Sequence, residues 1–175
     1  PLAGAMVLCA LFTKIGAYGM LRFALPMFPE GAQVVTPLVT TLAVIGMLYT
    51  GAMALVQTNI VCVLSFVGLA YMGFVVLGLF ATNQQGVEGA LFHMVSHGLV
   101  MVGLMLFAGV LHDRVGSTEI KAFGGLATRM PVFAFCGMIF VLAFLSVPGT
   151  SGFVGVLLSV VGVFETHGAL ALLAL

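Results

Sequence analysis

Charged side chains are scarce in this chain. Only 6% of its 175 residues are Asp, Glu, Lys or Arg, whereas soluble globular domains carry roughly a quarter. Hydrophobic residues make up 62% of the sequence, and the mean hydropathy is +1.31. These values exclude a water-soluble fold and indicate an integral membrane protein, with the lipid bilayer as its main surrounding.

The sequence also lacks the features of several functional classes. It has no basic run, and five Lys and Arg balance five Asp and Glu, so nothing favours nucleic-acid binding. Cys9, Cys62 and Cys136 stand singly in apolar runs, which supports neither a disulfide framework nor a thiolate metal site. No nucleophile–base pair, phosphate loop or haem motif occurs. The chain therefore offers no redox site of its own.

Turn signals divide the chain into apolar segments of about 20 residues, the length of a transmembrane helix. The predicted spans cover about 2–25, from after Pro37 to about Gln57, about 60–81 and about 87–111. A fifth apolar stretch, 131–164, is too long for one straight span. The chain starts without methionine and stops in the apolar run 169–175. We therefore expect residues 1–175 to form one transmembrane domain, as a piece of a longer polytopic protein.

The fifth stretch is interrupted by the sequence SVPGTSG at 146–152. A simple proline kink is the commoner outcome for a lone proline. The clustering of glycines and hydroxyl residues around Pro148 and Gly149 favours a broken helix instead. The predicted fold class is therefore all-α: a polytopic transmembrane helix bundle of about five spans plus the start of a sixth, with the last full span broken near Pro148-Gly149.

The basic residues predict how the bundle is oriented. Five successive spans place the segments 57–59 and 112–130 on the same side as the start of the first span. That side carries three basic residues: Arg114, Lys121 and Arg129. The other side carries Arg22 alone. The positive-inside rule therefore puts the 112–130 segment in the cytoplasm.

One charged residue, Lys14, lies well inside a predicted span. Holding it there costs about 2.5–3.5 kcal/mol on insertion scales. Snorkelling to a membrane surface is the alternative, but Lys14 lies about midway along its helix, where its stem reaches neither surface easily. We therefore interpret Lys14 as a proton-loading site. Tyr18 lies one turn further along the same face and is a candidate hydrogen-bond partner.

His93 and His97 are four residues apart on the fourth predicted span. This spacing suits a metal, but a third ligand is needed and no nearby carboxylate offers one, so we expect no metal site. A buried His97 could relay protons or could be an ordinary interior histidine, and spacing alone leaves both open. His93 is nearer the helix start and is expected to face the headgroups.

Six segments resemble a single protein family: KIGAYGMLRFALPMFPEG (14–31), ALVQTNI (54–60), MGFVVLG (72–78), QGVEGALFHMVSHGL (85–99), FGGLATRMPVFA (123–134) and VPGTSGFVG (147–155). The family is the antiporter-like membrane subunit of respiratory complex I, called chain M, or chain 4 in mitochondria. The resemblance implies helices eight to twelve of a fourteen-helix chain, with the start of the next. The broken stretch matches the family's discontinuous twelfth helix.

The resemblance implies a proton-translocating subunit of an NADH–quinone oxidoreductase in the bacterial inner membrane, or alternatively the mitochondrial inner membrane. Lys14 falls on a central lysine of the family's relay and His97 on a histidine of its eleventh helix, and the two would exchange protons through water. NADH, FMN, iron–sulfur clusters and quinone would bind in other subunits, with no cofactor in this chain. Its partners would be neighbouring membrane subunits.

Several positions depart from the family pattern, nearly always towards a less polar side chain. Asn59 stands for an acid, Val61 and Cys62 for a basic pair, and Tyr71 for a histidine. Val156 stands where the family has a glutamate, and it cannot exchange a proton. Two other functions stay open, the first because multisubunit antiporters share this fold and the second because of these apolar replacements. One is a cation/proton antiporter subunit, and the other is a structural membrane piece without transport.

Overall fold

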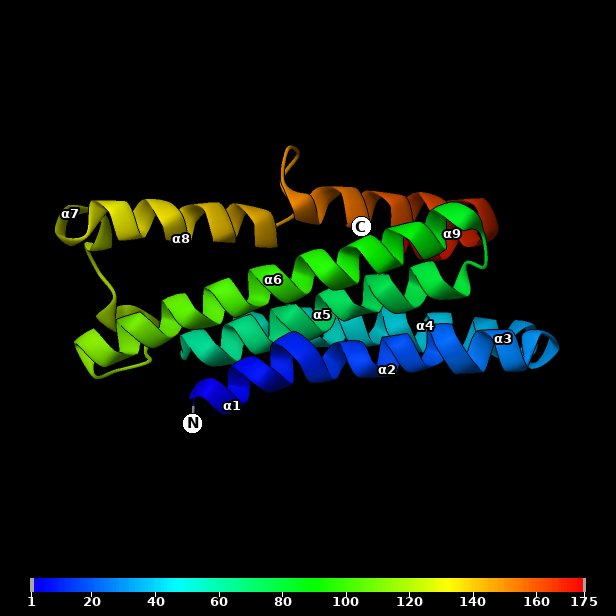
Figure 1. Ribbon diagram of the computed structural model, residues 1–175, viewed down its shortest axis with the longest axis horizontal. Coiled ribbons are helices and arrows are strands. Elements are labelled where there is room, and N and C mark those ends of the chain that lie inside the picture. The colour runs from blue at the N-terminus through cyan, green and yellow to red at the C-terminus, as the bar shows by residue number, and fades with distance from the viewer. Residues whose placement is uncertain (1, 175) are drawn as a thin grey trace.

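Most of the chain consists of long apolar helices that run along one common axis (Figure 1). The computed structural model describes residues 2–174. Four helical stretches are long and apolar enough to cross a membrane: Leu8–Met27, α4 (Pro29–Leu55), α5 (Ile60–Phe80) and α6 (Gln84–Val115). Two further apolar helices, α8 (Pro131–Phe144) and α9 (Ser151–Ala174), follow each other along one side of the bundle (Figure 1). The predicted polytopic helical fold is thus confirmed.

The first span contains two π-helical turns. Its segments are α1 (Leu2–Val7), η1 (Leu8–Phe12), α2 (Thr13–Gly19), η2 (Met20–Ala24) and α3 (Leu25–Met27). In η1 the Thr13 N–H bonds to the carbonyl of Leu8, five residues back. A regular α-helix would direct this N–H to the carbonyl of Cys9. The π turn therefore leaves the Cys9 carbonyl to other donors.

The second span begins earlier than predicted. Helix α4 starts at Pro29, and Pro37 lies inside it, so the predicted start after Pro37 is wrong. Pro29 occupies the first turn, where a missing N–H costs nothing. Around Pro37, the hydroxyl of Thr41 donates to the Pro37 carbonyl at 2.8 Å. The backbone hydrogen bond that Pro37 removes is a different one, to the Gln33 carbonyl four residues back.

The fourth span is also longer than predicted, because both of its ends are capped. The Asn83 side chain accepts a hydrogen bond from the Gly86 N–H at 2.8 Å, so α6 starts at Gln84 instead of near 87. At the other end Gly116 adopts φ +74° and its N–H bonds to the His112 carbonyl at 2.7 Å. His112 is therefore a helical residue.

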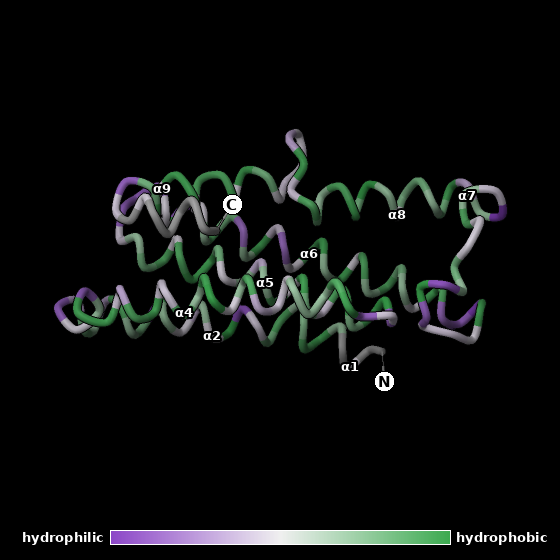
Figure 2. The backbone as a smooth tube through the Cα atoms, turned by 180° about the vertical axis from the view of Figure 1, so that it is seen from behind, coloured by the Kyte–Doolittle hydropathy of each residue, from purple (hydrophilic) through white to green (hydrophobic). Residues whose placement is uncertain are grey.

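The two polar segments expected on one side of the membrane lie together. The Ile60 N–H bonds to the Thr118 carbonyl and the Ile120 N–H to the Thr58 carbonyl, both at 3.0 Å. The N-terminus lies at the same end of the bundle (Figure 1). Polar residues collect at the bundle ends and apolar residues along its length (Figure 2). The predicted arrangement of these segments is confirmed, and their cytoplasmic location stays a prediction.

The fifth apolar stretch is broken as predicted. Helix α8 ends at Phe144 and α9 begins at Ser151, and the chain between them projects from the bundle (Figure 1). Gly149 has φ +94°, in the region that favours glycine, and Ser146 has φ +53°. Helix α9 continues to Ala174, so the structure gives the predicted start of a sixth span no separate helix.

Helices α6 and α9 approach each other to backbone contact. A Cβ added to Gly155 of α9 would lie 2.7 Å from Cβ and 2.8 Å from Cα of His93. Gly162 of α9 approaches the backbone of Gly86 in the same way. Small residues at such positions let membrane helices pack closely without any side chain between them. This contact fixes the segment of α6 that carries the two histidines.

Candidate functional site: a lysine–histidine pair

Lys14 and His97 meet in the interior of the bundle, although 83 residues separate them in the sequence. Lys14 Nζ lies 2.8 Å from Nδ1 of His97. Only one proton fits between these nitrogen atoms, because two facing N–H groups would repel each other. The structure therefore shows direct contact where the sequence interpretation had water between them. A proton can pass along this hydrogen bond in either direction.

The π turn before Lys14 helps to hold its amine. Lys14 Nζ also lies 3.1 Å from the Cys9 carbonyl oxygen and 3.1 Å from Thr13 Oγ1. The Thr13 hydroxyl itself donates to the Cys9 carbonyl at 2.9 Å. The amine thus has three hydrogen-bond partners, which matches the three donors of an ammonium group. All three partners are neutral groups when His97 is in its neutral form.

His93 is buried rather than exposed to headgroups. Its side chain is only 2% exposed, so the expectation drawn from its place near the helix start is wrong. Two features explain this: α6 begins several residues earlier than predicted, and Gly155 of α9 packs directly on the His93 backbone. The His93 and His97 rings lie 5.5 Å apart between centroids.

Tyr71 of α5 completes an aromatic cluster around the histidines. Its ring centroid lies 5.8 Å from that of His93 and 6.0 Å from that of His97. Phe144, the last residue of α8, lies 5.3 Å from Tyr71 and 5.9 Å from His97. Within the described part of the chain, neither ring nitrogen of His93 nor Nε2 of His97 has a hydrogen-bond partner. These nitrogens are free to bind water or another donor or acceptor.

The remaining predicted site residues lie apart from the pair. Tyr18 is 53% exposed and is not among the hydrogen-bond partners of Lys14. Pro148 and Gly149 lie in the exposed break between α8 and α9. The nearby Ser146 and Tyr71 line a cavity of about 540 Å³ together with Val156. The cavity wall is therefore apolar at the position where the family resemblance expects a carboxylate.

Sequence reasoning missed two contributors to the site. One is the Cys9 carbonyl, which loses the Thr13 N–H as a partner at the π turn, a turn that the sequence pattern does not signal. The other is the Thr13 hydroxyl. Thr13 directly precedes Lys14 in the sequence, so it could have been proposed as a hydrogen-bond partner of the amine. His93 and His97 gain no metal-binding partners from the fold: among residues 2–174 no group of three potential ligands from His, Cys, Asp and Glu is assembled.

These features define the class of protein: a polytopic helical membrane protein with a half-buried lysine in contact with a buried histidine, and with a broken apolar segment. The transmembrane family model described as NADH:quinone oxidoreductase/Mrp antiporter matches residues 1–175. The chain belongs to this family.

Two curated relatives and one solved structure illustrate the match. The chain is 46% identical over 174 residues to NADH-quinone oxidoreductase subunit M of Rhodobacter capsulatus, covering 99% of this chain and 34% of the relative. It is 41% identical to NADH-ubiquinone oxidoreductase chain 4 of Marchantia polymorpha, covering 99% and 35%. A chain of respiratory complex I from Thermus thermophilus with bound NADH superposes with a TM-score of 0.89 at 35% identity, covering 92% and 34%. The chain spans about a third of the length of these proteins.

Proposed function

We propose that this chain belongs to a proton-translocating membrane subunit of an NADH–quinone oxidoreductase, and that Lys14 and His97 relay the proton. The family match and the relatives named subunit M and chain 4 support the assignment to such a complex. The observation that carries the relay is the 2.8 Å contact between Lys14 Nζ and His97 Nδ1. A charged side chain inside a membrane is costly and usually has a functional reason.

The contact permits a simple proton transfer. A protonated Lys14 gives a proton through its hydrogen bond to Nδ1 of a neutral His97. His97 then releases the proton on its Nε2 to the next acceptor. Proton exchange with water returns His97 to the form protonated on Nε2, which frees Nδ1, and the neutral Lys14 amine takes up a new proton. No protein group among the described residues occupies Nε2, so this nitrogen is free to release its proton. Charge on a neighbouring membrane subunit would drive the cycle by favouring one protonation state of Lys14.

The chemistry of electron transfer is assigned to other subunits. We expect NADH, FMN, iron–sulfur clusters and quinone to bind outside this chain. The expected partners are the neighbouring membrane subunits of the complex, and the chain contributes only proton movement. Its activity should therefore be measured as protons moved for each NADH oxidised.

The test replaces Lys14 by methionine, which keeps the length of the side chain and removes the amine. Inside-out membrane vesicles from cells that produce the variant together with its assembly partners are given NADH. We expect NADH oxidation to persist while proton uptake falls about tenfold or more, as when a proton-transferring group is removed. Lys121→Met is the matched control, because Lys121 is exposed in the loop after α6. Equal pumping by the two variants would contradict the relay.

The family description also names Mrp antiporters, which makes cation/proton antiport the second candidate. Replacing sodium by choline in the vesicle experiment separates the two functions. Pumping that persists without sodium supports the oxidoreductase subunit, and pumping that stops supports the antiporter. Val156 on the cavity wall favours a third, purely structural role. That role requires Lys14→Met and Lys121→Met to pump equally.

A further inference from the structure

His93 is a buried histidine that takes no part in the relay described so far. Its side chain is 2% exposed, and neither ring nitrogen has a hydrogen-bond partner within the described part of the chain. A buried polar group without a partner lowers stability, and nearly all such groups in proteins bond to protein or to ordered water. An apolar side chain would fill this space without that cost, so the imidazole of His93 needs an explanation.

The ring of His93 is a neighbour of the ring of His97. The two residues are one turn apart on α6, and their ring centroids lie 5.5 Å apart. Side chains on a helix lean towards its N-terminus, so the His97 ring lies over the turn that carries His93. His97 Nδ1 contacts Lys14 Nζ at 2.8 Å, whereas its Nε2 is buried and has no partner among the described residues. Unpartnered nitrogens of two adjacent histidine rings are therefore brought together inside the bundle.

One water molecule can join these nitrogens. Within residues 2–174 neither ring bonds directly to the other. Polar groups that are too far apart for a direct hydrogen bond are often joined by an ordered water, and a buried water needs two to four polar partners. His97 Nε2 and one nitrogen of His93 supply two of them. Of the other rings in the cluster, Phe144 has no polar side-chain atom and Tyr71 has a hydroxyl group.

The partner of His97 Nε2 determines how this ring can serve Lys14. A neutral imidazole carries its proton on one nitrogen and accepts with the other, and the hydrogen bond made by one nitrogen sets the role of the other. A group that accepts from the Nε2–H keeps the proton there and leaves Nδ1 as the acceptor for the ammonium group of Lys14. A ring protonated on Nδ1 would instead point its N–H at the donors of that ammonium group.

We propose that His93 is a positioning residue of the relay: through one bridging water it accepts the Nε2–H of His97 and so keeps His97 Nδ1 free for the proton of Lys14. The inference rests on the proposed relay of Lys14 and His97. In each cycle one proton enters His97 at Nδ1 and another leaves from Nε2. Exchange with the bridging water then moves the remaining proton from Nδ1 back to Nε2, and the acceptor on His93 favours this form.

The His93 side chain can be replaced without loss of the contact between α6 and α9. A Cβ added to Gly155 would lie 2.7 Å from Cβ and 2.8 Å from Cα and N of His93. These are atoms that glutamine and leucine also have. His93→Gln and His93→Leu should therefore both assemble, which native gel electrophoresis of solubilised membranes checks.

The test compares proton uptake by these two variants in the inside-out vesicles given NADH. Glutamine keeps a hydrogen-bond acceptor at position 93, whereas leucine has none. We expect proton uptake for each NADH oxidised to fall about fivefold in His93→Leu, a factor that corresponds to about one net hydrogen bond, and at most about twofold in His93→Gln. A side chain that only fills buried space would give the reverse order, because burying an amide is more costly than burying leucine. The reverse order, or equal pumping by the two variants, would overturn the proposal.

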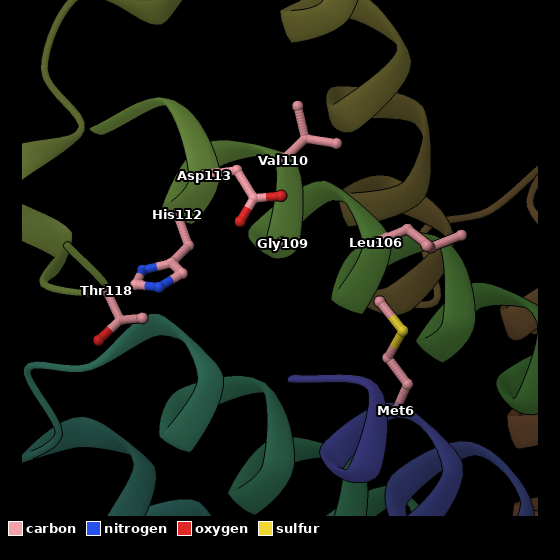
Figure 3. A pocket seen from close by; sticks show the side chains of 7 residues that line it. All are labelled: Met6, Leu106, Gly109, Val110, His112, Asp113 and Thr118. Carbon is pink, nitrogen blue, oxygen red and sulfur yellow. The ribbon is translucent and has the colours of Figure 1, made fainter. Parts of the chain in front are cut away.

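His112 provides a matched control on the same helix. Its Nδ1 is likewise buried and without a partner among the described residues. It lies fifteen residues beyond His97, about 22 Å along the helix axis at 1.5 Å per residue. Its ring extends towards Thr118 and lines a pocket at the end of the bundle (Figure 3). His112→Leu should therefore pump normally, and a loss as large as that of His93→Leu would overturn the specific role of His93.

Two further variants separate the alternatives. If the Tyr71 hydroxyl is the partner of His97 Nε2, Tyr71→Phe loses more pumping than His93→Leu. We expect the opposite order, and a greater loss from Tyr71→Phe would overturn the assignment to His93. If Lys14→Met pumps as well as Lys121→Met, the relay itself fails. Loss of pumping in Lys14→Met together with normal pumping in His93→Leu overturns only the role of His93, so the two failures are distinguishable.

Discussion

Helix α6 faces two neighbours in contrasting ways. Towards α9 the backbones touch, and a Cβ on Gly155 would lie 2.7 Å from the Cβ of His93. Towards the first helix there is ordinary space, since a Cβ on Gly98 would lie 3.6 Å from the Ala10 carbonyl and 3.9 Å from Cε of Lys14. His93 and His97, one turn apart, belong to these two environments.

The two faces of α6 have different roles: the face towards α9 holds the backbone in place, and the face towards the first helix carries the lysine–histidine pair. At Gly155 no α9 side chain lies between the two backbones, so this contact fixes the position of the α6 backbone. The face towards the first helix instead presents a long lysine side chain with rotatable bonds to a histidine ring. A proton-transferring pair needs small adjustments of distance, and only the second face permits them. The rigid contact on one side thus makes a reproducible hydrogen bond possible on the other.

The largest expected effect comes from filling the rigid contact. Gly155→Leu would press a side chain into the His93 backbone, and overpacking of this kind costs about 3 kcal/mol or more when backbone must move. We expect the amount of assembled complex in membranes to fall strongly. Native gel electrophoresis of solubilised membranes measures this amount. Gly46→Leu is the control, because a Cβ on Gly46 of α4 meets nothing within 4 Å. Equal losses from both variants would show that the α9 contact has no special role.

A smaller effect is expected from replacing either histidine. It should be confined to proton pumping and should be larger for His97 than for His93. Glutamine in place of His97 can keep a hydrogen bond to Lys14 but cannot pass a proton, so pumping should fall about tenfold or more. Glutamine in place of His93, whose neighbours are α9 and Tyr71, should lower pumping less, with assembly unchanged for both. The measurement is proton uptake for each NADH oxidised. A greater loss from His93→Gln would reverse the proposed division between the two faces.

The smallest effect is expected on the looser face. Gly98→Ala adds a methyl group at ordinary van der Waals distances and favours the helix by up to about 1 kcal/mol. Pumping should stay at the wild-type level, and the solubilised complex should withstand a slightly higher temperature before it dissociates. Loss of assembly comparable to that of Gly155→Leu would mean that both faces of α6 are equally tight.

Much of the architecture could be predicted from the sequence, because lipid restricts what an apolar chain can do. The spans, the broken stretch around Pro148 and the meeting of the two polar segments followed from length, turn residues and chain direction. Helix ends were less accurate. Pro29 and Pro37 both suit a first helical turn, and only the folded chain shows that the earlier proline begins α4.

The candidate residues Lys14 and His97 could be named from the sequence, but their geometry could not. Lys14 stood out because a charge in an apolar span is rare. His97 was selected by the family resemblance, since its spacing from His93 left its role open. Their direct contact depends on how closely two distant helices approach, which no local pattern encodes. The burial of His93 depends in the same way on Gly155, 62 residues further along the chain.

The π turn at Leu8–Phe12 has a consequence for which way the first helix faces. Such a turn holds one residue more than an α turn. Lys14 follows Met6 by eight residues. In a regular helix of 3.6 residues per turn, their two side chains would point about 80° apart around the helix axis. With one residue absorbed by the π turn the separation is that of seven residues, about 20°. A single inserted residue therefore aligns the Met6 side chain with the Lys14 amine that meets His97, on one stripe of one helix.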